Sequence, residues 1–323
     1  MRTLVFTQVF TQVVIMTLLL AGQAAARDLR ADLVSADQAL AAGDYGAAYA
    51  AYASHAERNP LAQFNLGLIE QQGWGRPADP VAACTWFDRA AHGHIPAAQQ
   101  FLGDCLAHGL GRAVDGPAAV AWYRQAAASG VAVADCAAGE LYLRGAIVPR
   151  DERLGLALCT RAAQGESVPA MLTLANFTRN TGNLPLARYW YGQAAERHSL
   201  AAQFALGVMQ SEGAGGPADQ AQARFWFETA ARAGHAPAYL PTAILYANAP
   251  TDPHTGALAP DDLARIYLWN QAAHASTTNP AQLAEIARIA ALVEAVMPAQ
   301  WRPELDRKVA AHLARFSPHS PTP

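Results

Sequence analysis

The sequence has little charge and few aromatic residues, and each shortage excludes a class of protein. Charged residues make up 15% of the 323 residues, the formal net charge is −3, and Lys308 is the one lysine. Nucleic-acid-binding proteins carry clustered basic surface, so we expect no nucleic-acid partner. Aromatic residues make up only 8%, whereas alanine makes up roughly a quarter, far above ordinary usage. Alanine favours helices and disfavours strands, which argues against all-β and parallel α/β folds. With 52% hydrophobic residues, the chain is too apolar to remain disordered.

Long apolar runs are absent except near the N-terminus, where the pattern is that of an export signal. Arg2 supplies a positive charge, an apolar run extends from Val13 to Ala21, and small residues precede a cut after Ala26. This order is typical of a secretory signal peptide. A retained membrane anchor is the alternative, but it needs about 20 mostly apolar residues. We therefore expect residues 1–26 to be removed, leaving a periplasmic or secreted chain with no transmembrane segment.

The remainder of the sequence repeats with a period of 36 residues. Four series keep this register: Leu66-Gly67, Leu102-Gly103 and Ala138-Gly139; Ala90-Ala91, Ala126-Ala127 and Ala162-Ala163; Gly73, Gly109 and Gly145; Asp79, Asp115 and Asp151. Such a period is typical of solenoids. The fourth repeat lacks four residues at its glycine loop, the fifth restores the pattern, and the sixth contains an insertion with Pro250, Pro253, Gly256 and Pro260 that predicts a loop.

Each repeat is predicted to be a helical hairpin. In the first repeat, Ala62, Leu66 and Ile69 form one stripe of a helix over residues 61–72. Gly73 ends that helix, because glycine adopts the left-handed terminal conformation at low cost. Asp79 begins the second helix as its N-cap.

The pattern resembles the Sel-1-like repeat (SLR), a relative of the tetratricopeptide repeat. The second repeat shows the signature nearly whole: Ala98, Leu102-Gly103, Gly109-Leu110-Gly111, Asp115, Trp122-Tyr123 and Ala126-Ala127. The resemblance covers about Leu61 to Ala273 and implies an all-α superhelix of about six hairpins. Repeats three, four and six depart from the signature: Leu158 replaces the tryptophan in repeat three, and repeats four and six lack the loop glycines.

These patterns divide the chain into five segments. They are a signal peptide (1–26), an N-terminal helical cap like a tetratricopeptide hairpin (27–60), six repeats (61–279), a C-terminal helical cap (280–316) and a disordered tail (317–323). We expect one helical stretch from Asp28 to Ala42, and an apolar stripe of Leu283, Ile286, Ile289, Val293 and Val296 in the C-terminal cap. The caps cover the end repeats, which lack a neighbour.

Four tryptophans occupy the same position in their repeats, which predicts that they lie in the core. Trp74, at a loop tip, should be exposed instead.

No motif for catalysis, cofactor binding or metal binding emerges. The loop Gly109-Leu110-Gly111 follows a helix and lacks the lysine of a phosphate-binding loop. His92, His94 and His108 do not have zinc-ligand spacing. We therefore expect no catalytic residue, no cofactor and no metal.

The four cysteines allow two pairs. Cys84 and Cys105 lie level on neighbouring antiparallel helices, as do Cys136 and Cys159, so pairing is geometrically feasible in an exported chain. The alternative is four buried free thiols, since free cysteine is often buried.

Stacked hairpins form an extended groove lined by the first helices. Exposed polar positions there predict partner-binding residues, and an ordinary solvated face is the alternative for each: Gln100, Asp104, Glu140, Arg144, Asn176 and Arg179. The resemblance implies a non-enzymatic scaffold or regulator that binds another protein of envelope signalling, polysaccharide export or secretion. An immunity protein against a secreted effector is one such role.

The alternative function is cell-wall ligand binding or β-lactamase-like activity, as associated with cysteine-rich members of the family. Their cysteines lie near each inter-repeat turn, where this chain has Ala163 and Ala170. The sequence does not fix the partner, the pathway or the oligomeric state.

Overall fold

The computed structural model describes residues 29–316, which are helical with connecting turns and contain no strand. The expected signal peptide and C-terminal tail lie outside these residues. The chain divides after Ser167 into two compact units, the N-terminal unit (residues 29–167) and the C-terminal unit (residues 168–316), which are described separately. The all-α fold predicted from the repeats is confirmed.

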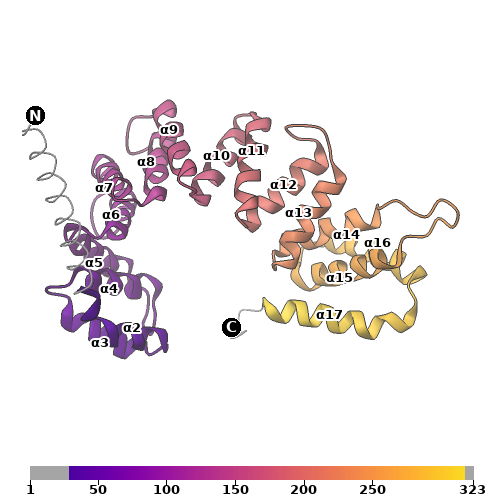
Figure 1. Cartoon of the computed structure of the whole chain (residues 1–323), viewed down its shortest axis with the longest axis horizontal. Coiled ribbons are helices and arrows are strands. Elements are labelled where there is room, and N and C mark those ends of the chain that lie inside the picture. Colours follow the sequence, from indigo (N-terminus) through magenta and orange to yellow (C-terminus); the bar gives the residue numbers. More distant parts are fainter. Residues whose placement is uncertain (1–28, 317–323) are drawn as a thin grey trace, which may run out of the picture. The chain divides into compact units, whose positions relative to one another are not determined.

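The N-terminal unit contains a capping pair of helices and three hairpins (Figure 1). The capping pair is α2 (Val34–Ala41) and α3 (Tyr45–His55). The hairpins are α4 (Pro60–Gln72) with α5 (Pro80–His92), α6 (Pro96–His108) with α7 (Gly116–Ala128), and α8 (Ala132–Arg144) with α9 (Glu152–Gln164). The helix expected from residue 28 to residue 42 is interrupted, because turn residues 32 and 33 separate a short helical segment from α2.

Helix starts and stops follow the predicted signals. The Asp79 carboxylate accepts hydrogen bonds from the backbone N–H groups of Val81 and Ala82, and Asp115, Asp151 and Asp219 cap the corresponding helices in the same way. At the other end, Gly73 closes α4 with φ of 69°, in the left-handed conformation that glycine tolerates best. Each cap contributes about 1 kcal/mol.

In three hairpins, a repeated glycine of the first helix makes room for a ring of the second helix. This glycine position is occupied by Gly67, Gly103 and Gly207, and each faces an aromatic residue at what we call the ring position: Phe87, Tyr123 and Phe227. A Cβ atom placed on Gly103 would lie 2.5 Å from Cε1 of Tyr123, closer than carbon atoms can approach. The glycine therefore sets the distance between the two helices.

The third hairpin meets the same constraint without a ring. Cys159 holds its ring position, and Gly139 faces Gly155 across the hairpin. A Cβ on Gly139 would lie 2.6 Å from the carbonyl oxygen of Gly155. Glycine on both helices therefore allows the backbones of α8 and α9 to approach closely.

The C-terminal unit contains three hairpins and two further helices (Figure 1). The hairpins are α10 (Val168–Asn180) with α11 (Leu184–Glu196), α12 (Leu200–Glu212) with α13 (Gln220–Arg232), and η1 (Ala236–Ala238) and α14 (Tyr239–Ala247) with α15 (Pro260–Ser276). The further helices are α16 (Pro280–Val296) and, after η2 (Ala299–Trp301), α17 (Arg302–Arg315). The shortened loop of repeat four and the inserted loop of repeat six both lie where the sequence predicts them.

Two predictions about tryptophans are wrong, and the apolar stripe of α16 is buried only in part. The tryptophans of the repeated position are half-buried rather than core: Trp86, Trp122, Trp190 and Trp226. Trp74 is half-buried rather than exposed, because it stacks on Tyr45 with ring centroids 5.9 Å apart. In α16, Ile286, Ile289 and Val293 are buried, but Val296 is 64% exposed.

We predict opposite effects of alanine at two helical glycines. Gly103→Ala should destabilise the protein by about 1–3 kcal/mol, because its methyl group overlaps the Tyr123 ring. Gly192→Ala is the control: apart from its chain neighbours and the nearby backbone of its own helix, no atom lies within 4 Å of the added Cβ. Alanine should therefore stabilise α11 by roughly 0.5–1 kcal/mol. Urea denaturation measures both changes. Equal effects of the two substitutions would refute the role given to the ring contact.

Candidate functional site

Two of the predicted polar residues of the first helices are hydrogen-bonded to the side chain at the ring position of the same hairpin. The residue that follows the glycine position, which Ala175 holds in the fourth hairpin, is the face position. It is occupied by Leu68, Asp104, Glu140, Asn176 and Val208. Where the ring position is tyrosine, its hydroxyl donates to a polar face residue: Tyr123 to Oδ1 of Asp104 at 2.7 Å, and Tyr191 to Oδ1 of Asn176 at 2.5 Å.

Where the ring position is phenylalanine, the face residue is apolar. Phe87 shares its hairpin with Leu68, and Phe227 shares its hairpin with Val208. A phenylalanine ring offers no hydroxyl, so a polar face residue would lack this donor. In these four hairpins, tyrosine at the ring position goes with a polar face residue and phenylalanine with an apolar one, which we call the pairing rule. The third hairpin lies outside this rule, since it has Cys159 at the ring position and Glu140 at the face position.

Asp104 lies in a partly desolvated setting. Burial raises the pKa of its carboxyl group, while the hydrogen bond from Tyr123 and the nearby His108 oppose that rise and Glu140 adds to it. Burial also raises the pKa of Tyr123, and the Asp104 and Glu140 carboxylates raise it further. The hydroxyl thus remains protonated and available as the donor.

The structure brings three of the predicted residues of the N-terminal unit together. Glu140 of α8 acts electrostatically on both Asp104 and Tyr123, so the α6 and α8 residues share one surface. Glu140 also pairs with Arg144 one turn later, at 2.6 Å, and the Arg144 side chain is 63% exposed. Gln100 is half-buried, one turn before Asp104. We call Gln100, Asp104, Glu140 and Arg144 the N-terminal face.

The C-terminal unit presents the other two predicted residues. Asn176 and Arg179 of α10 are exposed, and the Arg179 guanidinium lies 5.8 Å from the centroid of the Tyr191 ring. The same tyrosine therefore contacts both residues, which we call the C-terminal face. Burial raises the pKa of Tyr191, and the Arg179 cation lowers it.

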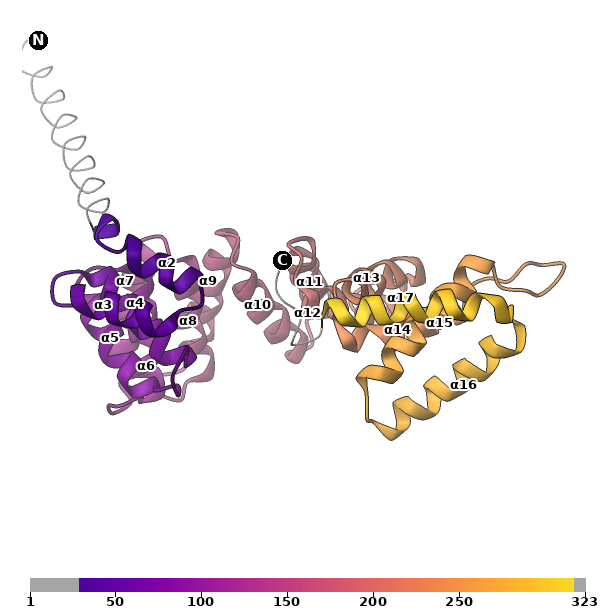
Figure 2. The ribbon, with the colours of Figure 1, turned by 90° about the horizontal axis from the view of Figure 1, so that it is seen from below.

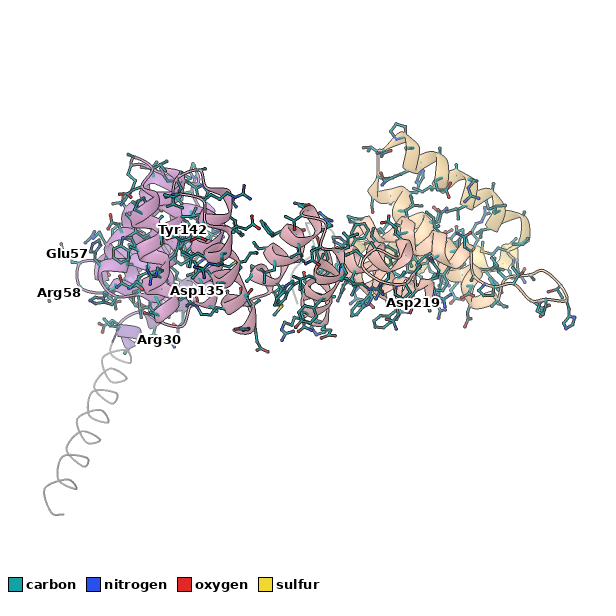
Figure 3. All side chains as sticks on the ribbon, turned by 90° about the horizontal axis from the view of Figure 1, so that it is seen from above. Arg30, Glu57, Arg58, Asp135, Tyr142 and Asp219 are labelled. Carbon is teal, nitrogen blue, oxygen red and sulfur yellow. A yellow bond between two sulfur atoms is a disulfide. The ribbon has the colours of Figure 1, made fainter. Side chains whose placement is uncertain are left out.

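Sequence reasoning missed an ion pair in the third hairpin, between the buried Asp135 and the exposed Arg161. Asp135, labelled in Figure 3, accepts two hydrogen bonds from Arg161, at 2.6 Å from Nε and 2.5 Å from a terminal nitrogen. The repeat pattern contained a signal for this ion pair. Hairpins one, two and five have glutamine at the position that Asp135 occupies in the third hairpin. Gln63 and Gln203 donate to the carbonyl groups of Ala56 and Ala195 at the ends of the preceding helices. An aspartate cannot donate in this way and pairs with an arginine instead.

The structure joins all four cysteines in two disulfides. Cys84 of α5 is bonded to Cys105 of α6, and Cys136 of α8 to Cys159 of α9, with sequence separations of 21 and 23. The first disulfide links two hairpins and the second links the helices of one hairpin. Both lie in the N-terminal unit.

Two further properties bear on function. Within residues 29–316, no helix is both long and apolar enough to cross a membrane. The same residues bring together no group of three or more His, Cys, Asp and Glu side chains that could hold a metal ion.

Stacked helical hairpins with small residues at the helix contacts define an α-solenoid, a class of repeat scaffold. The Sel1 repeat model matches residues 60–93, 96–131, 132–167, 179–199 and 200–235. The chain therefore belongs to the Sel1 repeat family, whose repeats mediate protein–protein interactions. No curated protein matches the chain.

Solved structures resemble this chain in fold. A protective antigen of uropathogenic Escherichia coli with an SLR fold is 22% identical, with a TM-score of 0.60 over 90% of this chain and 58% of its own. This chain thus spans less than two thirds of that relative. A Sel1 repeat protein from Oxalobacter formigenes is 26% identical, with a TM-score of 0.59 over 75% and 98%. An immunity protein from Pseudomonas aeruginosa is 22% identical, with a TM-score of 0.44 over 66% and 83%.

We predict strong coupling between Tyr123 and Asp104. Tyr123→Phe should cost about 1.5–3 kcal/mol, because the carboxylate loses its donor. Asp104→Leu should cost about 1–3 kcal/mol, because the tyrosine hydroxyl loses its acceptor. The double variant reproduces the Phe87–Leu68 pair of the first hairpin and should cost less than the sum by at least about 1 kcal/mol. Urea denaturation of all four proteins tests this, and strictly additive costs would contradict the pairing rule.

Reduction of the disulfides should destabilise only the N-terminal unit. Each disulfide closes a loop of about 22–24 residues and should contribute roughly 3 kcal/mol. Hydrogen exchange measured with and without reductant should show lost protection in residues 29–167 and none in residues 168–316. Non-reducing peptide mapping is the control, and four free thiols would contradict both disulfides.

Proposed function

We propose that this protein is a periplasmic, non-enzymatic scaffold or regulator that binds a partner protein on the first helices of its hairpins. The N-terminal and C-terminal faces are the binding surfaces of the two units. The proposal includes removal of residues 1–26 and needs no cofactor. An oxidising compartment such as the periplasm favours disulfides, which agrees with two cystine pairs.

The observation that carries this proposal is the fixed position of polar groups on the faces. The Tyr123 hydroxyl donates a hydrogen bond of 2.7 Å to Asp104. The Tyr191 hydroxyl donates one of 2.5 Å to Asn176. A side chain already held in place loses less conformational entropy when it binds. The Asp104 and Asn176 side-chain oxygens keep acceptor capacity beyond the tyrosine bond, so a partner's donors can still reach them.

The spacing of these groups favours a protein segment over a small molecule. In the N-terminal unit the polar groups come from two successive first helices, α6 and α8, and Arg144 extends the set to the end of α8. An extended segment with complementary donors and acidic side chains could contact all of them. Blocking a secreted effector, as an immunity protein does, is one form of this function, and identifying the partner distinguishes it from assembly roles.

Charge reversal on the faces tests the proposal. We expect Arg144→Glu and Arg179→Glu each to weaken a stoichiometric partner complex by about tenfold or more, which corresponds to roughly 1.4 kcal/mol. Arg124→Glu is the matched control, because Arg124 is an exposed arginine on the second helix α7. The measurement is affinity purification from periplasmic extract, followed by titration with the purified partner.

Three results would contradict the proposal. They are the absence of any stoichiometric protein partner, equal binding by all three variants, and turnover of a chromogenic β-lactam that is lost on mutation. Recovery of the mature chain from the cytoplasm alone would contradict the proposed location.

A further inference from the structure

The last helix of the described chain is attached by few contacts. In Figures 1 and 2, α17 runs alongside α15, and the two helices are in direct contact. Leu305 is its one buried residue, and the Tyr267 hydroxyl donates to Oδ1 of Asp306 at 2.6 Å. A helix with so little buried surface belongs to the low-stability end of a protein. Small changes in its remaining contacts can therefore shift its docking equilibrium.

The C-terminal half of α17 is held through His312. Its ring lies among three aromatic rings, with centroids 5.4 Å from Tyr239, 5.2 Å from Trp269 and 5.2 Å from Phe316. Its Nε2 lies 3.1 Å from the Tyr239 hydroxyl. Tyr239 and Trp269 are each only 2% exposed, so this histidine covers two core rings of the sixth hairpin.

Phe316 completes the contact on the turn before η1. It packs directly against Gly234, where φ is 87° and an added Cβ would overlap the phenylalanine ring. The next residue, His235, is half-buried beside Phe204. The docked end of α17 thus contacts the turn at Gly234, the residue before His235.

The groups that face His312 disfavour a positive charge on it. Burial lowers the pKa of His312, and the neighbouring Arg315 cation lowers it further. From the other elements packed against it come the Tyr239 hydroxyl and the uncharged Trp269 ring, and the adjacent turn adds His235, whose pKa burial also lowers. None of these groups is a carboxylate. The Tyr239 hydroxyl can accept a hydrogen bond from neutral or protonated imidazole, so burial and Arg315 decide the preference.

We propose that the C-terminal half of α17 is a pH-sensitive cap, docked while His312 is neutral and released when His312 is protonated. Release uncovers Tyr239 and Trp269 on the last hairpin of the repeat array. An end repeat without its cap exposes an apolar face that another protein can cover. Mild acid would therefore regulate access to this end of the C-terminal unit, whatever partner the N-terminal and C-terminal faces bind.

The direction of the pH effect follows from linkage. The pKa of His312 in the docked state is below the ordinary value of about 6.5 that it regains when α17 is free. Docking therefore has its full stability above about pH 6.5 and loses stability as the pH falls through the docked-state pKa.

Hydrogen exchange of the whole protein at pH 7.5 and pH 5.0, corrected for the intrinsic exchange rate, tests this proposal. We expect protection of peptides from residues 302–316 to fall at least threefold at pH 5.0, with no change in α12. His312→Phe keeps an aromatic ring without a titrating group and should give equal protection at both pH values. His274→Gln is the matched control, because His274 is an exposed histidine on α15, and it should respond as the wild type does.

A second variant keeps the test decisive if His312→Phe fails to dock. Arg315→Gln removes the neighbouring cation, so the docked-state pKa should move toward its ordinary value and the pH-dependent fall should become smaller. Constant protection in the wild type, an undiminished fall in His312→Phe, or an unchanged fall in Arg315→Gln would each overturn the proposal.

Discussion

The closest approach between the two helices of a hairpin is the constraint on which the rest of the structure depends. In four of the six hairpins a glycine on the first helix faces the second helix, as Gly103 faces the Tyr123 ring, and the other two have the small residues Ala175 and Ala243 there. In the third hairpin, glycine on both helices takes the place of the ring. Because packed interiors tolerate little overlap, this contact fixes the distance between the two helices of a hairpin.

The same contact links the interior of a hairpin to its outer surface. A ring at the ring position fills the space beside the glycine, and its hydroxyl, where present, reaches the face position one residue further along. Tyr123 and Tyr191 therefore fix the polar groups Asp104 and Asn176 in place. In the hairpins with a phenylalanine or tyrosine at the ring position, the choice between the two goes with the polarity of the face residue and changes the packing volume little.

The repeat architecture could be predicted from the sequence because its signals are local. A helix cap such as Asp79 and a left-handed glycine such as Gly73 act within a few residues of each other, and the 36-residue period identifies their equivalents. The roles of Tyr123 and Asp135 could not be predicted, because they depend on contacts between residues of different helices, 19 and 26 positions apart in the sequence. The half-burial of Trp86 was missed for a related reason, since a repeated position shows equivalence but not depth. The identity of the partner could not be predicted, because no motif of the sequence specifies it.

Site-specific photo-cross-linking tests the central claim, that the first-helix faces bind a partner protein, most directly. A photoreactive amino acid would replace Gln100 on α6 in one protein and the exposed Ala121 on α7 in another, within living cells. The account predicts a single protein adduct from position 100 and none from position 121. Adducts from position 121 alone, or from neither position, would contradict it.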